Sequence, residues 1–124
     1  MPSRLLAIAA FLIAVGFGLV MTFTGDDTAK KGYIIAIVEV SDQAKYGEYM
    51  KLSPSVIEHF GGRFVARAGN TKVLEGLPVT GRVVIVEFPN FERAEQFYNS
   101  PEYQAARKLR EGAATAQFIL IEGS

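Results

Sequence analysis

The chain has 124 residues, enough for one domain of ordinary size, and its 13 basic and 13 acidic residues give a formal net charge of zero. Because no basic stripe stands out, nucleic acid is not expected as a partner. The chain has no cysteine and one histidine, His59, which excludes disulfides, thiol catalysis and a multi-histidine metal site within one chain. We therefore expect no metal and no cofactor.

The chain begins with an apolar segment, residues 5–25, that contains no charged side chain. As a helix at about 1.5 Å per residue it would be roughly 30 Å long, which is the thickness of the hydrocarbon core of a bilayer. We expect residues 1–31 to be a membrane anchor with a linker, making a single pass with the following domain outside the cytoplasm. The alternative is a signal peptide that is removed on export.

The first strand of the domain is expected at Tyr33–Val40, where both alternating sets of side chains are hydrophobic, as in a strand covered on both faces. A helix with one apolar face is expected from Gln43 to Phe60, and Gly61-Gly62 ends it. Pro54 within this helix predicts either a kink or a second helical segment capped by Ser53.

The second half of the pattern contains three more strands and one helix. A Ser100-Pro101 pair within that helix predicts that it breaks and restarts, because serine is a good N-cap and proline suits the first helical position. The expected elements are a strand at Arg63–Ala68 that resumes at Lys72–Glu75 after a turn at Gly69-Asn70, a strand at Arg82–Phe88, a helix from Asn90 to about Glu111, and a strand at Ala116–Glu122.

This order predicts an α+β domain over residues 32–124 with the ferredoxin-like βαββαβ arrangement, a four-stranded antiparallel sheet with two helices on one face. The first and third strands are apolar on both sides, yet the helices can cover only one face of the sheet. A second copy of the chain is the simplest cover for the other face. We therefore expect a homodimer formed through the sheet face, a dimeric α/β barrel.

Several phrases of the domain resemble those of a known family. They are Tyr46-x-x-Tyr49, Gly61-Gly62-Arg63-Phe64-Val65-Ala66-Arg67, Leu74-Glu75-Gly76, Val86-Glu87-Phe88-Pro89, Phe97-Tyr98-x-Ser100-Pro101-x-Tyr103 and Ile121-Glu122-Gly123. The pattern is similar to a small bacterial family of unknown function in the dimeric α/β-barrel superfamily, and it spans Gly32 to Gly123. That superfamily includes cofactor-free monooxygenases, lactone isomerases and haem-handling enzymes, so the resemblance implies a fold and not a reaction. It supplies no catalytic residues.

Six side chains are candidate ligand contacts: Glu39, Tyr46, Arg63, Arg67, Glu87 and Tyr98. Glu39 and Glu87 are expected near the C-terminal ends of parallel neighbouring strands, where two adjacent carboxylates would raise the pKa of one and make it a general base. Alternatively, each glutamate pairs with an arginine.

The remaining candidates also have two interpretations each. Arg63 and Arg67 are expected to point the same way along the second strand, where they could hold a carboxylate or phosphate or could neutralise nearby glutamates. The tyrosines Tyr46, Tyr49, Tyr98 and Tyr103 either line a pocket or belong to the core. His59 is expected on the flank or surface of its helix.

The leading hypothesis is a membrane-tethered homodimer that binds a small, partly apolar molecule. One alternative is a cofactor-independent enzyme that performs proton transfer, isomerisation or a monooxygenase-like reaction. Another is a structural or interaction module without a ligand. The sequence identifies no catalytic residue, so it leaves open whether the domain is an enzyme.

Overall fold

The computed structural model describes residues 29–124. The predicted membrane segment, residues 5–25, lies outside the described residues and stays a prediction. Within residues 29–124, no helix is long and apolar enough to cross a bilayer.

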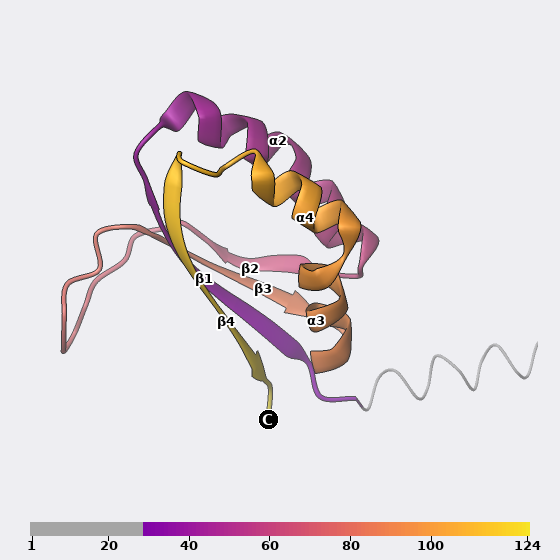
Figure 1. Ribbon diagram of the computed structural model, residues 1–124. Helices are drawn as coiled ribbons and strands as arrows, with labels where there is room; N and C mark the ends of the chain where they lie inside the picture. The colour runs from indigo at the N-terminus through magenta and orange to yellow at the C-terminus, as the bar shows by residue number, and fades with distance from the viewer. Residues whose placement is uncertain (1–28) are drawn as a thin grey trace, which may run out of the picture.

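The described chain folds into one sheet with all of its helices on one face (Figure 1). The strands are β1 (Gly32–Val40), β2 (Arg63–Arg67), β3 (Arg82–Phe88) and β4 (Ala114–Glu122), in the order β2-β3-β1-β4. Every neighbouring pair is antiparallel. The predicted ferredoxin-like α+β arrangement is therefore confirmed for this open, four-stranded sheet.

The expectation that the first and third strands run parallel was wrong. Strands β1 and β3 are antiparallel, with Tyr33 opposite Glu87 and Val38 opposite Arg82. One helical crossover and one hairpin connect β1 to β3, and the two connections together reverse the chain direction. As a result, the C-terminal ends of these two strands lie at opposite ends of the sheet.

The helix after β1 is α2 (Gln43–His59), which Asp42 caps by accepting a hydrogen bond from the backbone N–H of Lys45 at 3.0 Å. The backbone continues through Pro54 as one helix, so a separate segment capped by Ser53 does not form. The helix ends as predicted at Gly61, whose φ of 80° is in the left-handed region that glycine adopts without strain.

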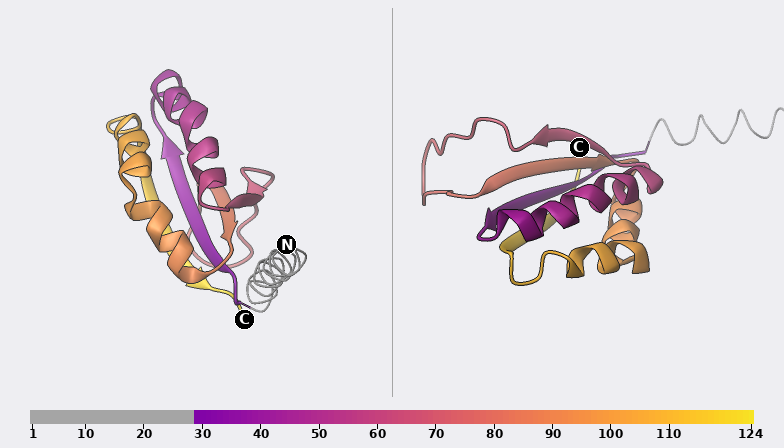
Figure 2. Two further views of the ribbon diagram at one scale, coloured as in Figure 1. Left: turned by 90° about the vertical axis from the view of Figure 1, so that its right-hand side faces the viewer. Right: turned by 90° about the horizontal axis from the view of Figure 1, so that it is seen from above.

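The second crossover contains two helices, α3 (Phe91–Asn99) and α4 (Pro101–Lys108). The predicted break between them is confirmed, because the Ser100 hydroxyl accepts a hydrogen bond from the N–H of Tyr103 at 3.0 Å and Pro101 opens the new helix. Helix α2 lies beside the α3–α4 pair over the same face of the sheet (Figure 2).

Strand β2 is shorter than predicted and contains a bulge at Val65. Phe64 pairs with Val86, and Ala66 pairs with the preceding β3 residue, Ile85, so Val65 has no partner of its own. The predicted continuation at Lys72–Glu75 does not form, because the chain turns out of the sheet after Arg67. Residues 68–81 instead make a loop that projects beyond the sheet (Figure 1).

The two faces of the sheet differ in what covers them. Towards the helices, Ile34, Val86 and Phe88 are at most 5% exposed and pack with the aromatic residues of the helices. The other face carries apolar side chains that no helix covers: Ile35, Ile37, Val83, Ile85, Ile119 and Ile121. We call these six residues the open face. Its edge is the more exposed part, with Ile119 at 42% and Ile121 at 52%.

Candidate functional site

A small cavity lies between α2 and the helix-covered face of the sheet. Its volume is about 50 Å³. Apolar side chains from β1, β3 and the helices make most of its wall. Its polar wall consists of the side chains Tyr46, Tyr49, Ser53, Arg67 and Arg82, and no acidic residue and no histidine lines it among the described residues.

Arg82 supplies a positive charge that has weak hydrogen-bond partners and no ion pair within residues 29–124. Its Nη1 donates to the sulfur of Met50 at 3.6 Å, and its guanidinium carbon lies 5.6 Å from the centre of the Tyr46 ring. Its Nε is buried and has no hydrogen-bond partner among the described residues. Because a buried donor without a partner costs free energy, an anion in the cavity would be stabilised by this guanidinium.

The tyrosine hydroxyls of the cavity are suited to donating hydrogen bonds. Burial raises the pKa of Tyr46, although the nearby guanidinium of Arg82 partly offsets that effect. Burial and the neighbouring Tyr103 hydroxyl also raise the pKa of Tyr49. Both side chains therefore stay protonated near neutral pH and cannot act as bases there.

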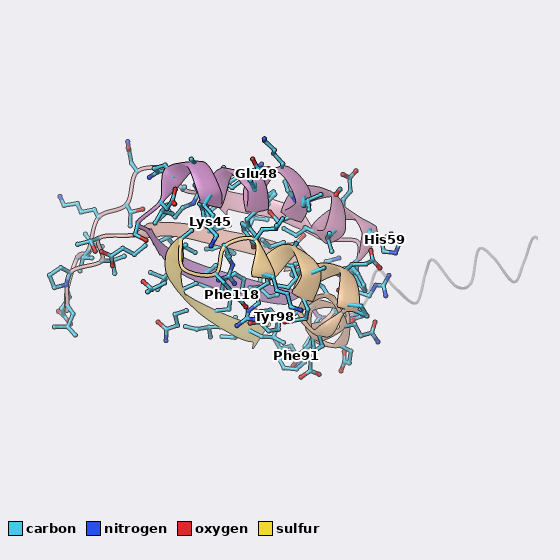
Figure 3. All side chains as sticks on the ribbon, turned by 45° about the horizontal axis from the view of Figure 1, so that its top comes forward. Lys45, Glu48, His59, Phe91, Tyr98 and Phe118 are labelled. Carbon is cyan, nitrogen blue, oxygen red and sulfur yellow. The ribbon has the colours of Figure 1, made fainter. Side chains whose placement is uncertain are left out.

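The cavity brings together only two of the six predicted contacts, Tyr46 and Arg67. Arg67 also covers the Phe64 ring, with its guanidinium carbon 4.1 Å from the ring centre. Tyr98 lies elsewhere, in a groove between α3 and β4, with its ring centre 5.7 Å from that of Phe118 (Figure 3).

The expectation that Arg63 and Arg67 point the same way was wrong. Arg63 is opposite Glu87, on the uncovered side of the sheet, whereas Arg67 is opposite Val84, which faces the helices. The bulge at Val65 causes this difference, since one extra residue moves the following side chains to the other face.

The expected pair of neighbouring carboxylates does not form. Glu87 is beside Tyr33 at one end of β1, whereas Glu39 is at the other end, opposite Thr115 of β4. Six residues of strand separate the two levels, which is roughly 20 Å. Within residues 29–124, no ion pair involves Glu39, which is exposed.

The alternative of ion pairing is confirmed for Glu87. Arg63 Nε donates to its Oε1 at 2.9 Å, and the Tyr33 hydroxyl donates to its Oε2 at 2.9 Å. These donors, Tyr33 first, hold the pKa of Glu87 below its usual value. A carboxylate stabilised in this way is a poor base near neutral pH.

His59 is exposed at the end of α2, as the sequence predicts (Figure 3). Within residues 29–124, no group of three or more histidine, aspartate or glutamate side chains is arranged to hold a metal ion.

Comparison with known families gives a match over nearly all of the described residues. Residues 31–124 match the family model described as a domain of unknown function, DUF1330. The chain belongs to the DUF1330 family. No curated protein sequence is significantly similar to the chain.

Solved structures share the fold of this DUF1330 domain at low sequence identity. A protein of unknown function from Rhodopseudomonas palustris, RPA0582, is 20% identical, with a TM-score of 0.61 over 84% of this chain and 92% of its own. SnoaB, a cofactor-independent oxygenase from Streptomyces nogalater, is 13% identical, with a TM-score of 0.56 over 77% of this chain and 95% of its own. At these identities the likeness shows the fold alone.

Sequence reasoning missed two arginines of the DUF1330 domain, Arg82 and Arg110. Arg82 belongs to the same alternating set of β3 as Val84 and Val86, so the alternation could have placed it towards the helices. Arg110 follows α4 by two residues, where a cation is common because it interacts favourably with the helix dipole. Nothing in the sequence distinguishes it from such a surface residue.

Changing Glu87 to glutamine should reduce the acid sensitivity of the domain. Since the folded-state pKa of Glu87 is lowered, its carboxylate stabilises the fold above the unfolded pKa of about 4.3, and that contribution is lost as the pH falls through the folded pKa. Urea unfolding of both proteins between pH 7 and pH 3 should show the stability advantage of the unmodified chain shrinking as the pH falls. Glu58→Gln, at an exposed position of α2, is the matched control. Parallel pH curves for the unmodified chain and Glu87→Gln would contradict the assignment.

Proposed function

We propose that the domain binds a small anion with an apolar body in the cavity between α2 and the sheet. The observation that carries the proposal is Arg82, a cation with a buried, unpartnered Nε beside a cavity without acidic side chains. In this arrangement the anionic group of the ligand pairs with Arg82, and Arg67 adds a second positive charge at the same wall.

The size of the cavity limits the ligand. A volume of about 50 Å³ corresponds to a few water molecules, since one water needs roughly 10–15 Å³ by this measure. Only a short aliphatic group therefore fits inside without movement of the side chains that line it. A branched short-chain carboxylate matches both the apolar wall and the guanidinium.

A cofactor-independent enzyme is the second candidate, and the fold shared with SnoaB favours it. The cavity chemistry favours binding instead. No carboxylate or histidine lines the cavity among the described residues, and the raised pKa values of Tyr46 and Tyr49 keep both hydroxyls protonated. A reaction here would require a substrate that loses its proton without a general base from these residues.

Replacing Arg82 with methionine should weaken binding of isovalerate, a branched short-chain carboxylate, by at least about tenfold, because a hydrogen bond to a charged group is worth about 1.5–3 kcal/mol. The ¹³C-methyl resonance of Met50 reports on the site, since its sulfur contacts Arg82. In a titration of the full-length chain, isovalerate should shift this resonance and the neutral isovaleramide should not.

Arg93→Met is the control for that titration, because Arg93 also stacks on an aromatic ring, that of Phe60 at 4.7 Å, but does not line the cavity. Equal responses to the acid and the amide, or unchanged binding in Arg82→Met, would reject the proposed site. Turnover of an added carboxylate would favour the enzyme.

We also propose that two copies of the chain associate through the open face. Its six apolar side chains lie on three adjacent strands, β3, β1 and β4. Two of these strands, β1 and β3, carry apolar residues on both faces. An exposed patch of this kind favours association, and a two-fold axis lets identical apolar surfaces cover each other. The third function, an interaction module without ligand, requires only this surface.

Replacing Ile85 with glutamate should convert the dimer to a monomer, because it buries a charge between the two paired apolar surfaces. Native mass spectrometry of the full-length chain measures the change, and far-ultraviolet circular dichroism checks that the fold persists. Leu52→Glu is the control, since Leu52 is exposed on α2, on the other side of the sheet. A monomeric unmodified chain, or a dimeric Ile85→Glu variant, would reject this interface.

The membrane attachment of the domain stays a proposal that rests on the composition of residues 5–25. The full-length chain should remain with membranes after alkaline carbonate extraction, whereas a chain that starts at residue 29 should be released. A full-length chain found shortened at its N-terminus and free of membranes would instead favour the signal peptide.

A further inference from the structure

A groove separate from the cavity runs between β4 and the helices α3 and α4. Its volume is about 380 Å³, within the range of roughly 300–1,000 Å³ that is usual for ligand pockets. Its apolar wall includes Tyr98, Phe118 and Leu120, and its polar wall consists of Glu95, Asn99, Arg107 and Arg110. Two arginines and one glutamate give this wall a positive balance.

Arg110 is the unusual residue of the groove, because it is a buried cation. Only 8% of it is exposed, and no ion pair within residues 29–124 involves it. Its Nη2 donates to the Tyr103 hydroxyl over a long 3.4 Å, and its Nε has no partner among the described residues. A buried charge without a counterion is costly, so the site is incomplete without an anion.

The surroundings of Arg110 hold it as a cation. Its guanidinium carbon lies 5.2 Å from the centre of the Tyr49 ring and 5.1 Å from that of Phe118. Burial lowers the pKa of Arg110, but the hydroxyls of Tyr103 and Tyr49 outweigh that effect and raise it above its usual value. The aromatic faces stabilise the charge without neutralising it.

We propose that the groove binds an aromatic carboxylate, whose anionic group pairs with Arg110 and whose ring packs against Tyr98 and Phe118. A guanidinium fork matches the two oxygens of a carboxylate, and aromatic rings prefer offset or edge contacts with one another. Figure 3 shows Tyr98 and Phe118 next to each other. Together they offer the aromatic wall against which the ring of the ligand would pack.

The groove does not depend on the function proposed for the cavity. The two hollows share only Ile34 and Phe118, which separate them. Arg82 lines only the cavity and not the groove, and Arg110 lines only the groove and not the cavity. Because Arg82 does not line the groove, an Arg82 variant serves as a control for binding in the groove.

The test compares 2-naphthoate with 2-naphthamide, which has the same ring and no charge, by calorimetric titration of the full-length chain. The carboxylate should bind at least about tenfold more tightly than the amide. Arg110→Met should remove this preference, whereas Arg82→Met and Arg93→Met should retain it. Arg110→Met should fold, because the hydroxyls of Tyr49 and Tyr103 still bond to each other at 2.7 Å.

Equal affinities for the acid and the amide would overturn the proposal, as would an Arg110→Met variant that folds and still prefers the acid. If that variant does not fold, the comparison of acid and amide in the unmodified chain decides alone. Loss of naphthoate binding in Arg82→Met with retention in Arg110→Met would assign the ligand to the cavity and reject the groove.

Discussion

Strand β1 is hydrogen-bonded on both sides, to β3 and to β4, and it carries apolar side chains on both faces. This constraint organises the rest of the domain. The helices α2, α3 and α4 all lie over the same face of the sheet, so they can bury only one set of side chains. The hydrophobic core, the cavity and the groove lie on that face, and no helix covers the apolar open face.

A group of polar side chains joins helix α2 to helix α4 and the residues that follow it. The Tyr49 hydroxyl of α2 bonds to the Tyr103 hydroxyl of α4, and Arg110 lies over the ring of Tyr49. The helices therefore meet through hydrogen bonds and aromatic contacts and not through aliphatic packing alone. Because such bonds depend on direction, they fix how α2 is placed relative to α4. The cavity and the groove lie on either side of this contact.

The strands, the helices and the break at Ser100 could be predicted because each has a local cause: alternation, an apolar stripe, or a cap. The site could not be predicted as well, because it depends on relations between distant residues. The position of Glu87 opposite Tyr33, and not beside Glu39, follows from strand direction. The orientation of Arg67 follows from an unpaired Val65, which the sequence does not mark. Arg110 resembles any cation near a helix end until its burial is known.

The bulge in β2 also affects how related domains could diversify. Arg67 reaches the cavity from the end of this edge strand. Which side chain does so depends on the number of residues before it, because each added or removed residue moves the following side chains to the opposite face of the sheet. An edge strand tolerates such length changes, since it has only one neighbour to stay paired with. A one-residue insertion or deletion in β2 would exchange Arg67 for a neighbouring residue and change the charge of the cavity, while β1, β3 and β4 kept their sequences.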